Sequence, residues 1–221
     1  MTDSVLTIET FTEPSFGENA FVVSATDNDG KKVGFVIDPS FPPAVHKLLS
    51  YIATEHILLE KIVLTHGHAD HVAGLDIVHT AHPDAAILMA KADQPMLADS
   101  YANLSAPFGM AITLQAQATD DLVPDMAFEM GPFTWKVLDT SGHSAGGRSL
   151  YCAQAGVVLT GDALFAGSIG RTDFPGSDHH QLIRHIRENL LSLPDATVVY
   201  SGHGPTTSVG NERKSNPFLS D

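Results

Sequence analysis

Seven residues that can bind a metal ion are grouped around short turns of this sequence. The segment 65–71 reads T-H-G-H-A-D-H, so His66, His68, Asp70 and His71 bring three imidazoles and one carboxylate into six residues. Imidazole and carboxylate are ligands that zinc, iron and manganese accept in proteins. In extended backbone His66 and His68 point to the same side, whereas Asp70 and His71 would project from the first turn of a helix. One short segment can therefore supply ligands to two adjacent metal ions.

Three further candidate ligands, His143, Asp162 and His203, each stand directly after a glycine. A glycine at such a turn lets the backbone come close to a site, because it has no Cβ atom. The ordinary alternative is that the first histidine cluster is only part of a polar loop. Three more glycine turns that each carry a possible ligand argue against that alternative.

Three apolar stretches lead into these candidates. Residues 62–65, 157–161 and 198–202 each run as a predicted strand into a small polar residue and then into a possible ligand. Strands of α/β sheets commonly place functional groups at their carboxyl ends. If the three strands are neighbours in one sheet, the ligands converge at one edge.

The hydrophobic periodicity predicts alternating strands and helices. Strands are predicted at 5–8, 20–25, 32–37, 61–65, 86–89, 127–130, 133–138, 148–153, 157–160 and 197–200, and helices at 44–56, 71–82, 94–99, 178–191 and 210–214. No low-complexity linker divides the chain, so we expect one α/β domain over residues 1–221. Residues 91–125 have weak periodicity and several prolines, and a long irregular segment of this kind suits a substrate-facing wall.

Composition limits the possible partners. The 221 residues include 12 lysines and arginines against 26 aspartates and glutamates, a formal net charge of −14 that opposes binding to nucleic acid or to an anionic membrane. No apolar run approaches membrane-spanning length, and the first ten residues lack the features of a signal peptide. The single cysteine, Cys152, lies in a strand-like run and is predicted to be part of the core. We expect a cytoplasmic protein with a small-molecule substrate; the sequence does not indicate an oligomeric state.

The order of the candidate ligands resembles that of the metallo-β-lactamase superfamily, and the resemblance covers nearly the whole chain. It implies an αββα sandwich in which three imidazoles hold a first metal, a carboxylate and two imidazoles hold a second, and one carboxylate bridges them. By this resemblance the ligands are His66, His68 and His143 for the first metal, Asp70, His71 and His203 for the second, and Asp162 for the bridge. Asp38 matches an early aspartate of the family that orients a ligand, although a turn residue before Pro39 is an equal alternative.

A narrower resemblance rests on residues 166–176, A-G-S-I-G-R-T-D-F-P-G, and on the turn G-H-G-P at 202–205. These motifs are similar to those of the short hydroxyacylglutathione hydrolases, which are glyoxalase II-like thioesterases without a C-terminal helical domain. The GRTDF core also occurs in persulfide dioxygenases, which use one iron. The chain departs from the family pattern around His143, where serine and alanine replace two prolines, and this departure leaves the ligands unchanged.

The resemblance implies hydrolysis by a metal-bound hydroxide. Two divalent metal ions, zinc with iron or manganese as alternatives, would lower the pKa of a shared water, and the hydroxide would attack a thioester of the acylglutathione kind. Asp70 and Asp162 are then the candidate catalytic carboxylates. Arg171 is a candidate substrate-binding residue because guanidinium binds carboxylate in a bidentate manner, and its alternative role is to pair with Asp173.

The same ligand set is compatible with other functions. A mononuclear iron persulfide dioxygenase would use His66, His143 and Asp162 as a facial triad. A lactonase or β-lactam hydrolase would direct the same hydroxide at a cyclic acyl group. A metal-binding protein without turnover is the non-enzymatic alternative. Metal analysis combined with a comparison of thioester and persulfide turnover separates these functions.

Overall fold

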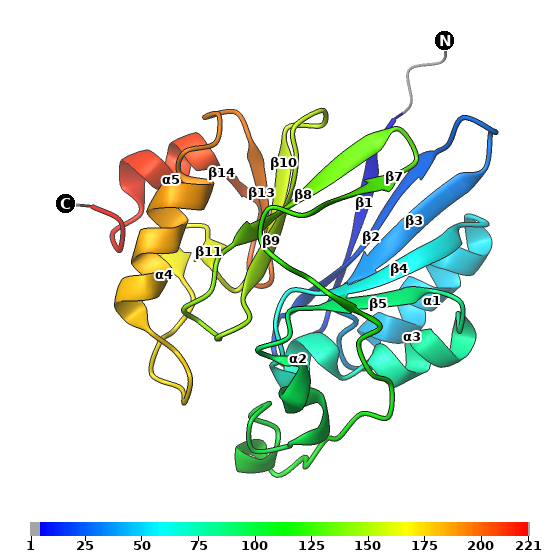
Figure 1. Ribbon diagram of the computed structural model, residues 1–221, viewed down its shortest axis with the longest axis horizontal. Coiled ribbons are helices and arrows are strands. Elements are labelled where there is room, and N and C mark those ends of the chain that lie inside the picture. The colour runs from blue at the N-terminus through cyan, green and yellow to red at the C-terminus, as the bar shows by residue number, and fades with distance from the viewer. Residues whose placement is uncertain (1–4, 221) are drawn as a thin grey trace.

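The computed structural model describes residues 5–220 and has two β-sheets that face each other, with helices on their outer faces (Figure 1). The strands of the first sheet are β1 (Thr7–Thr12), β2 (Asn19–Thr26), β3 (Lys32–Ile37), β4 (Leu58–Leu64), β5 (Ala86–Met89) and β6 (Asp120–Asp121). The strands of the second sheet are β7 (Ala127–Met130), β8 (Phe133–Asp139), β9 (Arg148–Cys152), β10 (Val157–Gly161), β13 (Val198–Ser201) and β14 (Thr207–Ser208). A small hairpin is formed by β11 (Leu164–Phe165) and β12 (Ser168–Ile169).

The helices are distributed between the two halves of the chain. They are α1 (Ala44–Thr54), α2 (Ala69–Val72), α3 (Leu75–Ala81), α4 (His179–His185) and α5 (Val209–Ser215), with 3₁₀ turns η1 (Gln94–Ala98) and η2 (Ala106–Phe108) and a π-helical turn η3 (Ile186–Leu190). The first sheet has the order β1-β2-β3-β4-β5-β6 and the second the order β14-β13-β10-β9-β8-β7. Helices α1 and α3 lie beside the first sheet, and α4 and α5 lie beside the second.

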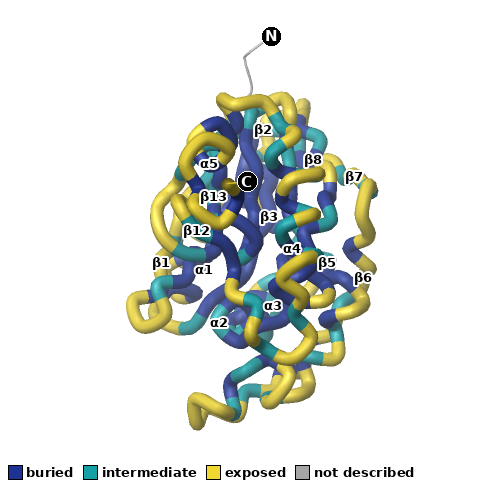
Figure 2. Tube along the Cα trace, turned by 90° about the vertical axis from the view of Figure 1, so that its left-hand side faces the viewer, coloured by how far each residue is buried: buried dark blue, intermediate teal, exposed yellow. Residues whose placement is uncertain are grey.

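Alternation of side chains along the strands builds a core on each face of each sheet. In β3, Phe35 points into the core between the two sheets, whereas Val36 points into the core under α1 and α3. In β10, Leu159 lies between the sheets and Val158 packs in the core that includes α4. Successive side chains of a strand point to opposite faces, so a strand buried on both faces is apolar throughout. Buried residues accordingly follow the central strands and exposed ones the surrounding helices and loops (Figure 2). The predicted αββα sandwich is confirmed.

Most predicted elements are present, and the largest difference concerns the helix predicted at 71–82. It is two helices, α2 and α3, separated at Ala73 and Gly74. The Gly74 backbone N–H donates to the Pro39 carbonyl at 2.6 Å, and a Cβ atom at Gly74 would lie only 2.7 Å from that oxygen. This close contact with the loop after β3 explains the break between the two helices. The sequence did not indicate it because Pro39 and Gly74 are distant in the chain.

Two further predictions about elements need correction, and four short strands were missed. The strand predicted at 5–8 begins later, as β1, because its position is set by pairing with β2, from Thr7 opposite Ser24 to Thr12 opposite Asn19. The helix predicted at 178–191 is helical only to His185 and then continues as the π-helical turn η3. The short strands β6, β11, β12 and β14 were not predicted. Within residues 5–220, no helix is both long enough and apolar enough to cross a membrane.

Candidate metal centre

The seven predicted ligands meet where the two sheets face each other. His66 and His68 follow β4, and Asp70 and His71 lie on α2, whereas the other three follow β8, β10 and β13 of the second sheet. The condition considered from the sequence, that the three strands are neighbours in one sheet, therefore holds only in part. Strands β10 and β13 are parallel neighbours, but β4 belongs to the other sheet. The convergence takes place across the sandwich instead of along one sheet edge.

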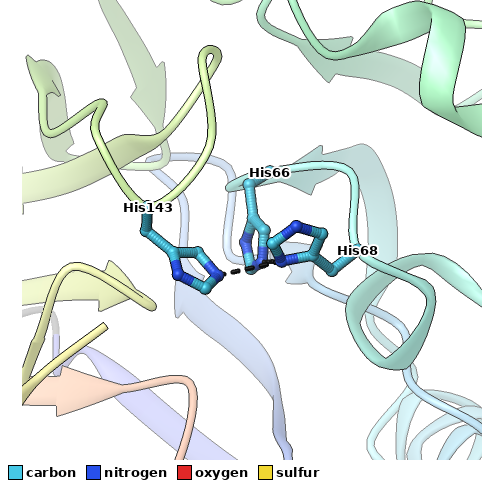
Figure 3. A group of neighbouring side chains, drawn as sticks. All are labelled: His66, His68 and His143. Atoms are coloured by element: carbon cyan, nitrogen blue, oxygen red, sulfur yellow. Dashed lines mark hydrogen bonds between the residues drawn. The ribbon is translucent and has the colours of Figure 1, made fainter. Parts of the chain in front are cut away.

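His66, His68 and His143 form the first group (Figure 3). His68 Nδ1 lies 3.0 Å from His66 Nε2 and 2.9 Å from His143 Nε2, and all three side chains are buried. Figure 3 shows His66 and His68 on one loop and His143 reaching toward them from another. Three imidazole nitrogens that face one another this closely form a set of donors for one cation.

Hydrogen bonds to residues outside this first group determine which ring nitrogen of His143 and of His66 carries the proton. His143 Nδ1 lies 2.7 Å from the carbonyl oxygen of Arg171, and since a carbonyl only accepts, Nδ1 carries the proton and Nε2 is free. The Thr65 hydroxyl donates to Asp38 at 2.6 Å, so it accepts from His66 Nδ1 at 3.1 Å. Both imidazoles therefore direct an unprotonated Nε2 into the group.

A second group contains Asp70, His71 and His203. Asp70 Oδ2 lies 3.3 Å from His203 Nε2 and 4.0 Å from His71 Nε2. The Asp162 carboxylate lies between the groups: Oδ1 is 3.3 Å from His71 Nε2, and Oδ2 is 3.6 Å from His143 Nε2 and 3.5 Å from His203 Nε2. One carboxylate thus reaches imidazoles of both groups, which is the arrangement that a bridging ligand requires.

Asp38 combines the two roles that the sequence left open. It stands in the turn after β3 with a positive φ of 49°, and its carboxylate accepts from His71 Nδ1 at 2.9 Å and from the Thr65 backbone N–H at 2.7 Å. The bond to Nδ1 leaves His71 Nε2 facing Asp162. Asp38 is therefore a turn residue that also orients an imidazole.

Burial and neighbouring charges set the protonation states of the group. Burial, together with His143, lowers the pKa of His68 to about 3, and burial with His71 and His68 lowers the pKa of His66 well below its usual range. Burial alone would raise the pKa of Asp162, but His71 and His203 hold it well below its usual range. At neutral pH His66 and His68 are thus neutral and Asp162 is ionised, which are the forms that bind cations. Burial alone would lower the pKa of His71 and of His203, but the carboxylates of Asp162 and Asp70 raise the pKa of His71 well above its usual range and also raise the pKa of His203, so a cation bound in the second group would displace protons there.

Buried polar atoms without a hydrogen-bond partner indicate whether metal cations would fit between the two groups. His71 Nε2 and Asp162 Oδ1 are buried and have no hydrogen-bond partner, a costly state unless another group satisfies them. The backbone at Gly202 lies so close that a Cβ atom there would meet Asp162 Oδ1 and would lie 2.7 Å from His71 Cε1. The donor set, its ionisation and these two unsatisfied atoms fit a pair of divalent cations.

Sequence reasoning missed two residues that hold the ligand-bearing loops. Asp93 is buried, and its carboxylate accepts from the backbone N–H of Gly67 at 3.1 Å and of Gly146 at 2.6 Å, so it joins the His66–His68 loop to the His143 turn. Asn19 donates to the carbonyls of Ser201 and Gly204 at 3.0 and 2.9 Å, and so fixes the turn that carries His203. Both interactions span distant parts of the chain, so no local motif indicates them.

A cavity of about 350 Å³ opens onto the centre and includes His68, Asp70, Asp162 and His203 in its lining. The segment predicted as a wall contributes four lining residues, Asn103, Leu104, Phe108 and Met110. The size falls in the range of small-molecule sites.

Arg171 also lines this cavity, and its side chain is exposed. Its guanidinium donates to both Asp173 carboxylate oxygens at 2.6 Å and lies 4.1 Å from the centroid of the Phe174 ring. The predicted pairing with Asp173 is therefore present. Contact with a substrate remains a prediction.

Comparison with known proteins places this site in a family. Residues 15–203 match the metallo-β-lactamase superfamily. The chain is 41% identical to the probable metallo-hydrolase YqgX of Bacillus subtilis over 79% of this chain and 82% of YqgX. It is 33% identical to the hydroxyacylglutathione hydrolase GloC of Haemophilus influenzae over 86% of this chain and 89% of GloC.

Solved structures agree with this placement. The B3 metallo-β-lactamase BLEG-1 superposes with a TM-score of 0.89 at 33% identity and covers 97% of this chain and 100% of its own. TTHA1623, solved in a di-iron-bound form, has a TM-score of 0.81 at 34% identity and covers 96% and 100%. The chain belongs to the metallo-β-lactamase superfamily. Within that superfamily it is a metallo-hydrolase.

Proposed function

We propose that the protein hydrolyses a thioester of the acylglutathione kind at a centre of two divalent metal ions. The observation that carries this proposal is the position of Asp162, whose carboxylate lies within 3.6 Å of imidazole nitrogens from both groups of candidate ligands. The likeness to a hydroxyacylglutathione hydrolase, GloC, supports the thioester. Zinc is the proposed metal, and iron is the first alternative because TTHA1623 was solved with two irons.

The proposed ligands are those of the two groups, with Asp162 shared between them. His66, His68 and His143 would hold one cation, Asp70, His71 and His203 the other, and Asp162 both. When bound, such a pair lowers the pKa of a coordinated water molecule and polarises a carbonyl group, which is the chemistry that ester and thioester hydrolysis needs.

The rest of the chain orients these ligands and the substrate. Asp38 and the Arg171 carbonyl hold protons on the outer nitrogens of His71 and His143, so that the inner nitrogens stay free. The Arg171 guanidinium is proposed to bind a carboxylate of the thiol portion, exchanging part of its contact with Asp173. A thiolate is a good leaving group, so no separate proton donor to sulfur is required. Because both sheets supply ligands, we propose that residues 1–221 act as one domain, and we retain the prediction of a cytoplasmic location.

Metal analysis and a matched activity panel test the proposal. We expect two zinc ions per chain after loading, and release of thiol from S-lactoylglutathione and S-acetylglutathione, followed with a chromogenic thiol reagent. The same preparation should consume no oxygen with glutathione persulfide. One iron per chain with persulfide-dependent oxygen uptake would replace the proposal by the dioxygenase that uses His66, His143 and Asp162.

A second candidate function is β-lactam hydrolysis, favoured by the TM-score of 0.89 to BLEG-1. A chromogenic cephalosporin and a γ- or δ-lactone, added to the same zinc-loaded protein, distinguish this function. A kcat/KM for the cephalosporin above that for every thioester would favour the second candidate. Zinc binding without turnover of any substrate class would favour a binding protein.

A further inference from the structure

An aromatic surface that no candidate ligand requires borders the cavity. The Phe16 ring stacks on Phe41 with centroids 5.4 Å apart, and the Phe108 ring meets Phe16 edge-on at 6.2 Å. Together with Leu104 and Met110 these rings line the cavity, and we call the five residues the aromatic wall. Phe108 is 63% exposed and Phe16 is 37% exposed, so apolar area faces the open cavity and not the core. An exposed apolar patch of this kind marks a binding surface.

Local hydrogen bonds fix the backbone that carries the wall. The Glu13 carboxylate accepts from the backbone N–H groups of Ser15 and Phe16 at 2.8 and 2.7 Å, which holds the turn before β2. The buried Asn103 side chain donates to the carbonyls of Met96 and Ile112, both at 3.0 Å, and so closes the segment that contains Phe108. The rings are thus presented from ordered turns, and the wall is preformed.

Charge on the cavity lining is sparse outside the candidate ligands. Among the described residues that line it, Arg171 is the only arginine and lysine is absent. Arg171 and Phe174 come from the second half of the chain, whereas the aromatic wall comes from residues 16–110 in the first half. If the thiol portion of the substrate bears a carboxylate, the Arg171 guanidinium is the positively charged side chain in the lining that can pair with it. The acyl portion would then lie against the aromatic wall.

We propose that the preferred acyl group is apolar, either an alkyl chain of about four to six carbons or an aryl ring, and that the aromatic wall binds it. This inference rests on the proposed thioesterase function. In the reaction, water adds to the acyl carbonyl carbon, the C–S bond breaks, and the products are a carboxylic acid and a thiol. Apolar acyl groups gain affinity by leaving water, and a small hydroxyacyl group such as lactoyl gains little.

Binding of inert analogues tests the wall without turnover. S-methyl-, S-butyl- and S-hexylglutathione are thioethers that cannot be hydrolysed, and calorimetry with the zinc-loaded protein gives their Kd values. We expect affinity to rise by up to about fourfold for each methylene that is fully buried. Hydrolysis of S-acetyl-, S-butyryl- and S-hexanoylglutathione should show the same order, with kcat/KM at least about tenfold higher for hexanoyl than for acetyl.

Substitutions in the aromatic wall test whether the dependence on chain length comes from these residues. Phe16→Ser and Phe108→Ser change exposed side chains and should flatten the dependence of Kd and of kcat/KM on chain length. Tyr101→Ser is the matched control, because Tyr101 is an aromatic residue of the same chain segment, is 76% exposed and lies outside the cavity lining. Its chain-length dependence should equal that of the wild type.

The outcomes separate this inference from the proposed function. Affinity that does not change with chain length, or a dependence that both phenylalanine variants retain, would overturn the aromatic wall as the acyl site. Chain-length-dependent binding that the variants abolish, with no hydrolysis of any thioester, would support the wall and overturn the thioesterase.

Discussion

At the scale of single residues, the centre depends on which nitrogen of each imidazole is protonated. His143 is fixed by a backbone carbonyl, His71 by Asp38, and His66 by a threonine hydroxyl that itself donates to Asp38. Asp38 therefore influences two imidazoles from one carboxylate. The HxHxDH pattern indicated the candidate ligands. Thr65 is next to His66 in the chain, but the other outer partners are distant in sequence from the rings they contact, so they could be found only from the fold.

Replacing Asp162 tests the proposed bridge. Asp162→Asn keeps the shape of the side chain and removes the charge between the two imidazole groups. We expect thioester turnover to fall by more than about 100-fold, the upper end of the range for residues that only support ligands. Bound metal should fall from two ions per chain toward one, with an unchanged circular dichroism spectrum. A folded variant with full metal content and wild-type turnover would argue against a bridged pair.

The Asp38→Asn variant tests whether Asp38 orients the His71 imidazole, without a change in the backbone of the turn. Asparagine tolerates the positive φ of 49° at this position, so the turn should persist. Its amide carries one acceptor oxygen, so the variant cannot satisfy both His71 and Thr65 as the carboxylate does. We expect metal affinity, measured by competition with a chromogenic chelator, to fall by about 10- to 100-fold while kcat at saturating metal changes less. Unchanged affinity would limit Asp38 to its role in the turn.

At the scale of elements, apolar runs between clear turn residues predicted strands well. Where the predicted bounds of helices and strands were wrong, contacts between distant parts of the chain determine the observed bounds. The bounds of β3, β5 and β7 were predicted as they stand, because a turn-forming or charged residue lies within two positions of each end. The division between α2 and α3 was missed because it depends on the contact of Gly74 with Pro39. The position of β1 was missed because strand pairing fixes it.

Asp93 is a buried carboxylate like Asp38, but it joins the His66–His68 loop to the His143 turn, whereas Asp38 orients the His71 ring. Asp93→Asn replaces one acceptor oxygen by a donor that faces a backbone N–H of Gly67 or Gly146. We expect the free energy of unfolding in urea to fall by about 1–3 kcal/mol and metal affinity to weaken by about tenfold.

Asp76→Asn is the matched control for this change. The Asp76 carboxylate also accepts from two backbone N–H groups, those of Gln115 and Ala116, but these lie outside the ligand-bearing loops. This variant should lose stability and keep its metal affinity. Equal metal affinity in the Asp93 and Asp76 variants would show that the Asp93 link is structural only.

At the scale of the whole molecule, the fold class and the family could be predicted from the sequence, since seven ligand positions and a repeated strand theme are local patterns. The aromatic wall could be predicted only in part: the segment 91–125, predicted as a substrate-facing wall, supplies Leu104, Phe108 and Met110, whereas Phe16 and Phe41 are far from it in the chain and stand in no motif. Likewise, the sequence indicated that the candidate ligands converge only if their strands are neighbours, and the packing of two sheets shows that they meet across the sandwich.

Removing metal tests the coupling between the centre and global stability. A ligand that binds only the folded state at about 100 times its Kd adds about 2.7 kcal/mol. For a chain of this size we therefore expect zinc to raise the melting temperature over the chelator-treated protein by about 5–10 °C. The Asp162→Asn variant should show a smaller shift under the same conditions. Identical melting curves with and without zinc would contradict a centre that binds only the folded protein.

The distribution of the proposed ligands over both sheets has a consequence for biosynthesis. A ribosome that has just translated His71 has produced four of the seven donors, but His203 lies more than a hundred codons downstream. The emerging chain can therefore hold a cation only weakly, through the first cluster, and the full complement forms once both halves have docked. For the proposed centre, metal loading would thus be a late maturation step, and we expect newly made protein to depend on cellular metal supply after its translation is complete.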